Sequence, residues 1–160
     1  MDIYREVFFV LNNILYCKLY AKIHENIADY SHKLAVEANG TGMPPIRPLF
    51  LEYPEQPEAW NDWQTFMYGP DILVSAIWQK NTSEHTCYLP EGEQWVDAWD
   101  ESTVHEGGQF LEVECPFHKI PVFIRKGAKV HPGKLNKIYK ESFELASKKP
   151  DLRKLEKKLF

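Results

Sequence analysis

The sequence is poor in cysteine. Its 160 residues include only Cys17, Cys87 and Cys115, and no two of these form a C-x-x-C pair. Neither a zinc site nor a disulfide framework is therefore predicted. We interpret all three as buried thiols in packed elements, because free cysteine behaves as a small apolar residue. A fold that does not depend on disulfides also suits a reducing compartment.

Long apolar runs and a basic start are missing as well. Residues 7–11 are apolar, but the run stops at Asn12-Asn13, and it is too short to span a bilayer. Residues 1–6 lack the basic segment that opens a signal peptide. We therefore predict no membrane partner. The localisation stays unknown on this evidence, with the cytoplasm favoured.

The charge is mixed in sign rather than strongly basic. The chain has 19 Lys and Arg against 23 Asp and Glu, which gives a net charge of −4. Residues 133–160 hold nine of the basic residues and four of the acidic ones. This segment lacks the aromatic and glycine pattern of a nucleic-acid-binding module. We expect a solvated helical face there, and no nucleic-acid partner.

The histidines show no metal-binding pattern. Neither H-x-x-x-H nor H-E-x-x-H occurs among the six, which are His24, His32, His85, His105, His118 and His131. Gly107-Gly108 predicts a hairpin turn rather than a phosphate-binding loop. We therefore predict no metal site, no cofactor site and no catalytic residue from these patterns.

Helical periodicity dominates both ends of the chain. Apolar residues recur at steps of three and four over residues 19–38, which predicts a long helix. The helix is expected to stop at residues 39–42, where Gly40 and Gly42 tolerate a positive φ. A second stripe over residues 135–146 and a third over residues 152–159 predict a helical tail, with Pro150 between them.

The middle of the chain reads as short strands separated by turns. Residues 46–51 form an extended run in which Pro48 favours a sheet edge, and residues 58–68 are expected to form a short helix. Further strands are predicted at residues 72–79, 86–89, 94–99, 109–114 and 121–125. The fold class is therefore α+β, with a helical segment (1–43), an antiparallel β-sandwich-like module (44–132) and a Lys-rich helical tail (133–160).

Four segments of the chain resemble glycoside hydrolase family 31, in the order in which they occur in that family. The first joins Gly42-Met43-Pro44 to Arg47-Pro48-Leu49-Phe50, and the second is Gln64-Thr65-Phe66-Met67-Tyr68-Gly69-Pro70-Asp71-Ile72-Leu73-Val74. The third is Tyr88-Leu89-Pro90-Glu91-Gly92 with Trp95, Asp97 and Trp99, and the fourth is Ile120-Pro121-Val122-Phe123-Ile124-Arg125-Lys126-Gly127. The resemblance covers the end of the family's catalytic barrel and the adjoining β-sandwich. In place of the family's Ala-Pro-Val, this chain has Ser75-Ala76-Ile77.

The resemblance implies a retaining glycosidase that acts on α-linked sugars. Retention needs two carboxyl groups about 5–5.5 Å apart, one as nucleophile and one as acid/base. In the family both precede the segment that matches here, so the resemblance implies no catalytic residue in this chain. Trp95-Val96-Asp97 shares only the Trp-x-Asp of the nucleophile motif, and we interpret Asp97 as structural. The chain is then the C-terminal part of a glycosidase, inactive by itself, and carbohydrate is the partner of the parent enzyme.

Two alternatives stay open: a free-standing carbohydrate-binding or scaffold module, and a protein–protein interaction module. Trp95 and Trp99 are four apart and would share a face of a strand, which suits a sugar platform, although core packing is favoured. Arg47 is expected to form a structural ion pair in preference to a ligand contact. The apolar stripe of residues 19–38 is expected to bind a barrel or to self-associate, unless residues 1–16 or the C-terminal helix fold over it.

Overall fold

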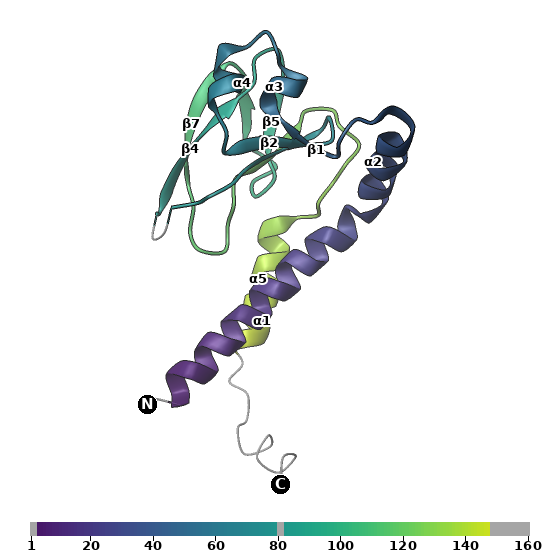
Figure 1. The fold of residues 1–160 in the computed structure, drawn as a ribbon. Helices are drawn as coiled ribbons and strands as arrows, with labels where there is room; N and C mark the ends of the chain where they lie inside the picture. The colour runs from purple at the N-terminus through teal and green to yellow at the C-terminus, as the bar shows by residue number, and fades with distance from the viewer. Residues whose placement is uncertain (1–2, 80–81, 148–160) are drawn as a thin grey trace.

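The computed structural model describes residues 3–79 and 82–147, and it begins with two helices (Figure 1). The predicted single helix is divided into α1 (Ile3–Asn26) and α2 (Ala28–Thr41), which meet at Ile27. The predicted stop is confirmed. Gly42 follows α2 with a φ of 77°, and its N–H donates to the Ala38 carbonyl at 2.9 Å, which is the left-handed C-terminal cap that glycine favours.

A six-stranded sheet forms the centre of the module. Its strands, in chain order, are β1 (Ile46–Pro48), β2 (Thr65–Tyr68), β3 (Ile72–Ser75), β5 (Gln94–Asp97), β6 (Val104–Glu106) and β8 (Val122–Arg125). Their spatial order is β1-β2-β3-β8-β5-β6, and every neighbouring pair is antiparallel. β1 lies at one edge, as Pro48 predicts, because proline has no N–H to donate to a further strand.

Two further strands, β4 (Glu84–Leu89) and β7 (Gln109–Glu114), form a separate antiparallel sheet. One apolar core lies between the sheets and joins Leu73 and Phe123 of the large sheet to Cys87 and Leu89 of β4. Neighbouring positions, such as Ile72 and Ile124, belong to a second core on the helical side. This alternation follows from the period of two along a strand. The predicted sandwich-like α+β fold is confirmed.

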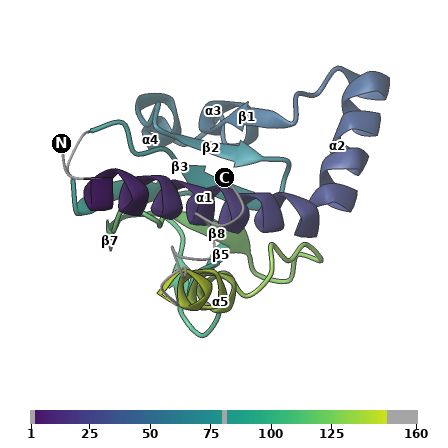
Figure 2. The same ribbon diagram turned by 90° about the horizontal axis from the view of Figure 1, so that it is seen from below.

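The helices form the third layer. α1 and α5 (Leu135–Ser147) lie side by side below the sheets in Figure 1, and Figure 2 shows α1 crossing beneath the strands. Leu19 and Leu34 of the predicted stripe are buried, and Ile23 and Tyr30 are half-buried. The structure therefore shows the alternative in which the C-terminal helix folds over the stripe, because α5 and the sheet cover these side chains. The stripe predicted at residues 152–159 lies outside the described residues.

Three local predictions are also wrong. Residues 58–68 contain the short helix α4 (Pro57–Asn61), but β2 occupies their end. The run at residues 46–51 leaves the extended conformation after Pro48 and forms the helical turn α3 (Leu49–Glu52). Gly107-Gly108 does not close a hairpin: β6 pairs with β5 and β7 pairs with β4, so the two glycines carry the chain from one sheet to the other.

None of the helices in the described part of the chain combines the length and the apolarity needed to cross a membrane.

Candidate functional site

A hydrogen-bonded row of polar side chains connects the two sheets. Thr65 of β2 lies 2.9 Å from Ser75 of β3, hydroxyl to hydroxyl, and the Ser75 oxygen lies 2.8 Å from Nε2 of His85 in β4. At the other end the Thr65 hydroxyl donates to Asp62 at 2.7 Å. Thr65 and Ser75 are buried, with Ser75 0% exposed. Sequence reasoning missed this row, because its members belong to three different strands and a loop.

The direction of these hydrogen bonds is fixed from the Asp62 end. A carboxylate only accepts, so the single Thr65 hydroxyl proton is used on Asp62. Thr65 must then accept from the Ser75 hydroxyl, and Ser75 must accept from His85. His85 therefore carries its proton on Nε2. Burial lowers the pKa of His85, although Asp62 acts in the opposite sense, so the neutral Nε2–H tautomer fits the row.

Asp62 holds the loop before β2 in place. Besides Thr65 Oγ1, its carboxylate accepts from the backbone N–H groups of Gln64, Thr65 and Tyr88 at 3.0–3.1 Å. The serine, histidine and aspartate do not form a hydrolase triad, because a triad aspartate orients the histidine directly. Here Asp62 contacts Thr65, and the candidate nucleophile Ser75 is closed to solvent. The row is a structural link between the sheets.

Arg47 forms the predicted ion pair. Its side chain is 4% exposed, and its guanidinium lies 2.5 Å from Glu52 of α3 and 3.1 Å from Glu37 of α2. Its Nε also donates to the Pro44 carbonyl at 2.8 Å. The interpretation as a structural ion pair is confirmed. Arg47 joins the end of α2 to α3, and its donors are committed to those contacts.

A second arginine, which the sequence analysis did not single out, plays a similar part. Arg125 of β8 lies 2.5 Å from Glu93, donates to the Tyr53 hydroxyl at 3.0 Å, and lies over the ring of Trp95. Burial raises the pKa of Tyr53 to about 12, so this phenol stays protonated. Within the described residues, the Arg125 Nε is buried without an acceptor. These contacts fasten β8 to the loops around it.

Trp95 and Trp99 are core residues. Trp95 lies in the core between the sheets and donates to the Pro90 carbonyl at 3.1 Å. Trp99 follows β5, lies in the core on the helical side, and donates to the Ile120 carbonyl at 2.8 Å. The two indoles therefore do not share a face, and core packing is confirmed in place of a sugar platform. Asp97 is structural as predicted: it accepts from the Trp99 N–H at 2.7 Å and pairs with Lys119 at 3.7 Å.

The cysteines and histidines do not converge. Cys87 and Cys115 are buried as predicted, but the prediction is wrong for Cys17, which is exposed on α1. Residues 14, 17 and 21 are spaced by three and four along α1, so all three lie on the outer side of this helix. His24 and His32 are exposed on two different helices. Among residues 3–79 and 82–147, no group of three metal-ligating side chains is close enough to hold an ion.

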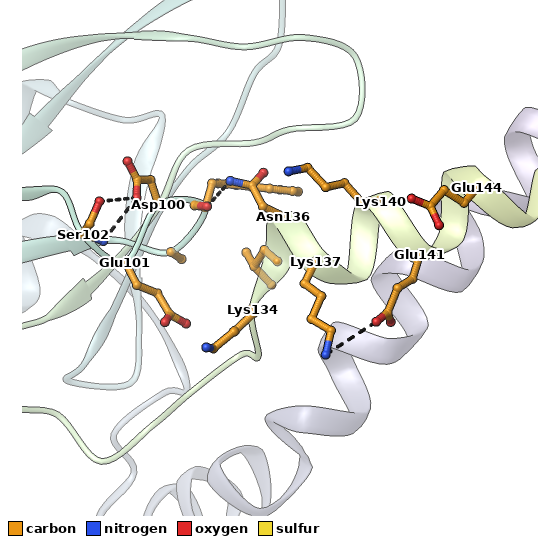
Figure 3. A pocket seen from close by; sticks show the side chains of 12 residues that line it. Asp100, Glu101, Ser102, Lys134, Asn136, Lys137, Lys140, Glu141 and Glu144 are labelled. Atoms are coloured by element: carbon orange, nitrogen blue, oxygen red, sulfur yellow. Dashed lines mark hydrogen bonds and ion pairs between the residues drawn. The ribbon is translucent and has the colours of Figure 1, made fainter.

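An open cavity of about 530 Å³ lies where the loop after β5 faces α5. Figure 3 shows Asp100, Glu101 and Ser102 on the loop side, with Lys134 just before α5 and two lysines and two glutamates along the helix. Lys137 lies 3.6 Å from Glu141, and Asp100 accepts a hydrogen bond from Ser102 at 2.6 Å. The mixture of both charge signs favours no particular ligand.

Four exposed aromatic side chains form two pairs near the start of β2. Trp63 and Trp78 have ring centroids 5.6 Å apart at an angle of 48°. Phe50 of α3 stacks on Trp60 of α4 at 4.8 Å and 18°. The tryptophans are 60–72% exposed, which is unusual for residues that normally dominate cores.

Comparisons with known proteins agree on the central module. The family model "Glycosyl hydrolase family 31 C-terminal domain" matches residues 42–130. The chain is 33% identical, over 72% of its length, to Alpha-glucosidase 2 of Bacillus thermoamyloliquefaciens, and 35% identical, over 68%, to a sulfoquinovosidase of Agrobacterium fabrum. It spans only 14% and 16% of these two relatives.

Solved structures give the same result. The crystal structure of a GH31 alpha-xylosidase from a soil metagenome, complexed with xylose, is 36% identical with a TM-score of 0.65. The match covers 67% of this chain and 16% of the xylosidase. A Flavobacterium johnsoniae GH31 dextranase, complexed with isomaltotriose, matches 66% of this chain at 34% identity and a TM-score of 0.63.

Proposed function

Since this chain belongs to glycosyl hydrolase family 31 through its C-terminal domain, we propose that it is the supporting, non-catalytic part of a retaining α-glycosidase. The parent reaction is the hydrolysis of α-linked glycosides, a part of carbohydrate metabolism. The observation that carries the proposal is the extent of the match: the relatives are glycosidases, and the chain corresponds to 14–16% of the first two. The catalytic carboxylates then belong to the remainder of such an enzyme.

The carboxylates of this domain support the proposal. A retaining glycosidase needs one free carboxylate to attack the sugar and a second carboxyl group about 5–5.5 Å away. Here Asp62 accepts four hydrogen bonds, and Asp97 accepts from backbone amides beside Lys119. Glu52 and Glu93 are each bound to an arginine. Side chains committed in this way hold strands and loops in position and are not available as nucleophiles.

The part of the enzyme that this domain supports is the catalytic barrel. The edge of the module around β1, α3 and α4 exposes several large apolar side chains, which are Ile46, Phe50, Leu51 and Trp60. A contiguous apolar edge of this kind is typical of a surface that packs on another domain. We propose that this edge, with the free face of α2 beside it, docks on a barrel and buttresses it.

Two measurements test the proposal. Incubation of the purified chain with chromogenic α-glucosides and α-xylosides is expected to give no turnover. Hydrolysis by the chain alone would contradict the proposal that it is non-catalytic. Mixing the chain with a catalytic-barrel fragment of a family 31 enzyme is expected to give a heavier species by light scattering. Ile46→Asp is expected to weaken that association, whereas Thr86→Asp, on an exposed position of β4, is the matched control.

A further inference from the structure

Trp63 and Trp78 form an exposed pair that none of the contacts described above explains. Trp63 is 72% exposed and Trp78 is 60% exposed, although their ring centroids are only 5.6 Å apart. The two residues are fifteen apart in sequence and meet because β2 and β3 are antiparallel neighbours: Trp63 precedes β2, and Trp78 follows β3. The pair therefore stands at one end of this strand pair.

The pair is built on a rigid support. The Trp78 indole N–H donates to Oε1 of Gln64 at 2.7 Å, and the Gln64 carbonyl accepts from the Ala76 N–H at 2.8 Å. The Gln64 N–H in turn donates to Asp62, whose carboxylate is fixed by three further donors. The Trp78 ring is thus held in the solvent by a chain of hydrogen bonds, and the Trp63 ring, which has no hydrogen bond of its own in the described residues, packs against it. Pre-organisation of this kind lowers the entropic cost of binding.

The chemistry of the pair is amphipathic. Within residues 3–79 and 82–147, neither the Trp63 indole N–H nor the Gln64 side-chain NH₂ has an acceptor. The pair thus combines apolar ring faces with free donors at their edge, a combination that suits small-molecule recognition. A pyranose matches it, because its C–H groups pack on aromatic rings while its hydroxyl oxygens accept at the rim. Within the described residues no cation–π contact involves either ring, and ring faces without a charged partner suit a neutral sugar.

We propose that Trp63 and Trp78 form a surface platform for a neutral α-linked gluco-oligosaccharide, with Gln64 as a donor at its edge. This inference rests on the proposed function, in that the parent enzyme meets such sugars. The platform would hold substrate at the surface of the enzyme. Binding to an open surface is expected to be weak, with a Kd on the order of 1 mM.

Trp60 provides a matched control within the same chain. It is 60% exposed, like Trp78, but its ring is stacked on Phe50 and its N–H is already bound to the Pro54 carbonyl at 2.9 Å. Trp60 therefore has the same exposed area without an open ring pair or a free donor. A specific platform requires Trp63 and Trp78 and does not require Trp60.

The test is titration of the full chain with isomaltotriose, followed by chemical-shift changes of the indole N–H signals. We expect the Trp63 and Trp78 signals to shift together, and Trp63→Ala or Trp78→Ala to weaken binding about tenfold or more. Trp60→Ala is expected to bind like the wild type. Circular dichroism of each variant separates loss of binding from loss of folding. The variant Gln64→Glu keeps the shape of the side chain and removes the NH₂ donor at the edge of the platform.

Three outcomes overturn the proposal. The first is that the Trp63 and Trp78 signals do not shift at a sugar concentration of about 20 mM, which is 20 times the expected Kd. The second is that Trp60→Ala weakens sugar binding as much as Trp63→Ala does. The third is that Trp63 and Trp78 are needed only for association with a barrel fragment. The last outcome would assign the pair to a protein interface. Failure of the platform leaves the non-catalytic proposal intact, because that proposal is tested by turnover. Turnover by the chain alone would, conversely, leave sugar binding by the pair unaffected.

Discussion

Ser75 has a position that a larger or an apolar side chain cannot fill equally well. It is closed to solvent, it donates to Thr65, and it accepts from His85 of the other sheet. Because the acceptor lies in β3 and the donor in β4, one hydroxyl couples the two layers.

Removal of that hydroxyl is expected to destabilise the fold. Ser75→Ala leaves the Nε2–H of the half-buried His85 without its acceptor and removes the donor to the buried Thr65, and the loss of a hydrogen bond in such a site costs about 1–3 kcal/mol. Urea denaturation measures the loss, and the exposed Ser83→Ala is the control, with an expected change within about 0.5 kcal/mol. The double variant Ser75→Ala/His85→Leu is expected to cost less than the sum of its single changes, since both partners are then apolar. Strict additivity would contradict the coupling.

At the scale of the element, the link between β6 and β7 has the strictest steric requirement. Gly107 passes so close to the loop after β4 that a Cβ built on it would lie 1.9 Å from the Pro90 carbonyl oxygen. The contact involves backbone on both sides, so a side-chain rotation cannot relieve it. This close approach allows the chain to leave the six-stranded sheet and enter the two-stranded one.

Gly107→Ala is therefore expected to lower the free energy of unfolding by about 1–3 kcal/mol, through overpacking against a rigid neighbour. Gly40→Ala offers the opposite case, because Gly40 lies in α2 with open space around it. Alanine there is expected to stabilise the helix by up to about 1 kcal/mol. Thermal unfolding of the two variants gives the comparison. A loss in both would indicate that general sensitivity to substitution, and not the Pro90 contact, is responsible.

The elements that the sequence predicts well are those with local causes. Gly42 stops α2 and Pro48 marks the edge strand, and both effects depend on one residue's own backbone. The sequence does not predict β6, because Val104, His105 and Glu106 have no alternation of apolar and polar residues. These residues form a strand because they pair with β5. The helix expected at residues 58–68 fails at its end for a similar reason: Thr65–Tyr68 fit both patterns, and their ladder with β3 decides.

Side-chain sites were less predictable than elements. Arg47 was identifiable because a charge between apolar neighbours implies a partner close by. The row from Asp62 to His85 and the Trp63–Trp78 pair join residues that only strand register brings together. Trp95 and Trp99 are predicted to share a face because the sequence indicates a strand through residue 99. The strand ends at Asp97, and Trp99 enters the other core.

At the scale of the whole molecule, α5 covers the face of α1 next to the sheet. Leu135 is buried in the second core, and Ile138 and Tyr139 pack beside it against Leu19 and its neighbours. His118 stacks on Tyr139 with ring centroids 3.7 Å apart, and Asn26 donates to the Pro132 carbonyl at 2.8 Å. α5 lies beyond the residues matched by the family model, which end at residue 130.

Loosening α5 is expected to promote self-association. Leu135→Ala removes a buried anchor at a cost of about 2–5 kcal/mol, which exposes the α1 face that the helix covers. Sedimentation velocity is expected to show more dimer and larger species for this variant than for the wild type. Lys140→Ala, on the exposed side of the same helix, is the control. Identical sedimentation of the two variants would show that α5 is not the cover.

The three thiols differ in reactivity, so chemical modification of cysteine can measure how often the folded chain opens. Cys17 stands in solvent, whereas burial raises the pKa of Cys87 to about 12 and also raises that of Cys115. Only the thiolate reacts with alkylating or disulfide reagents. At neutral pH such a reagent counts one sulfur in the folded chain and three in the unfolded one. The slow appearance of the second and third modified sulfurs therefore reports how often the sandwich opens.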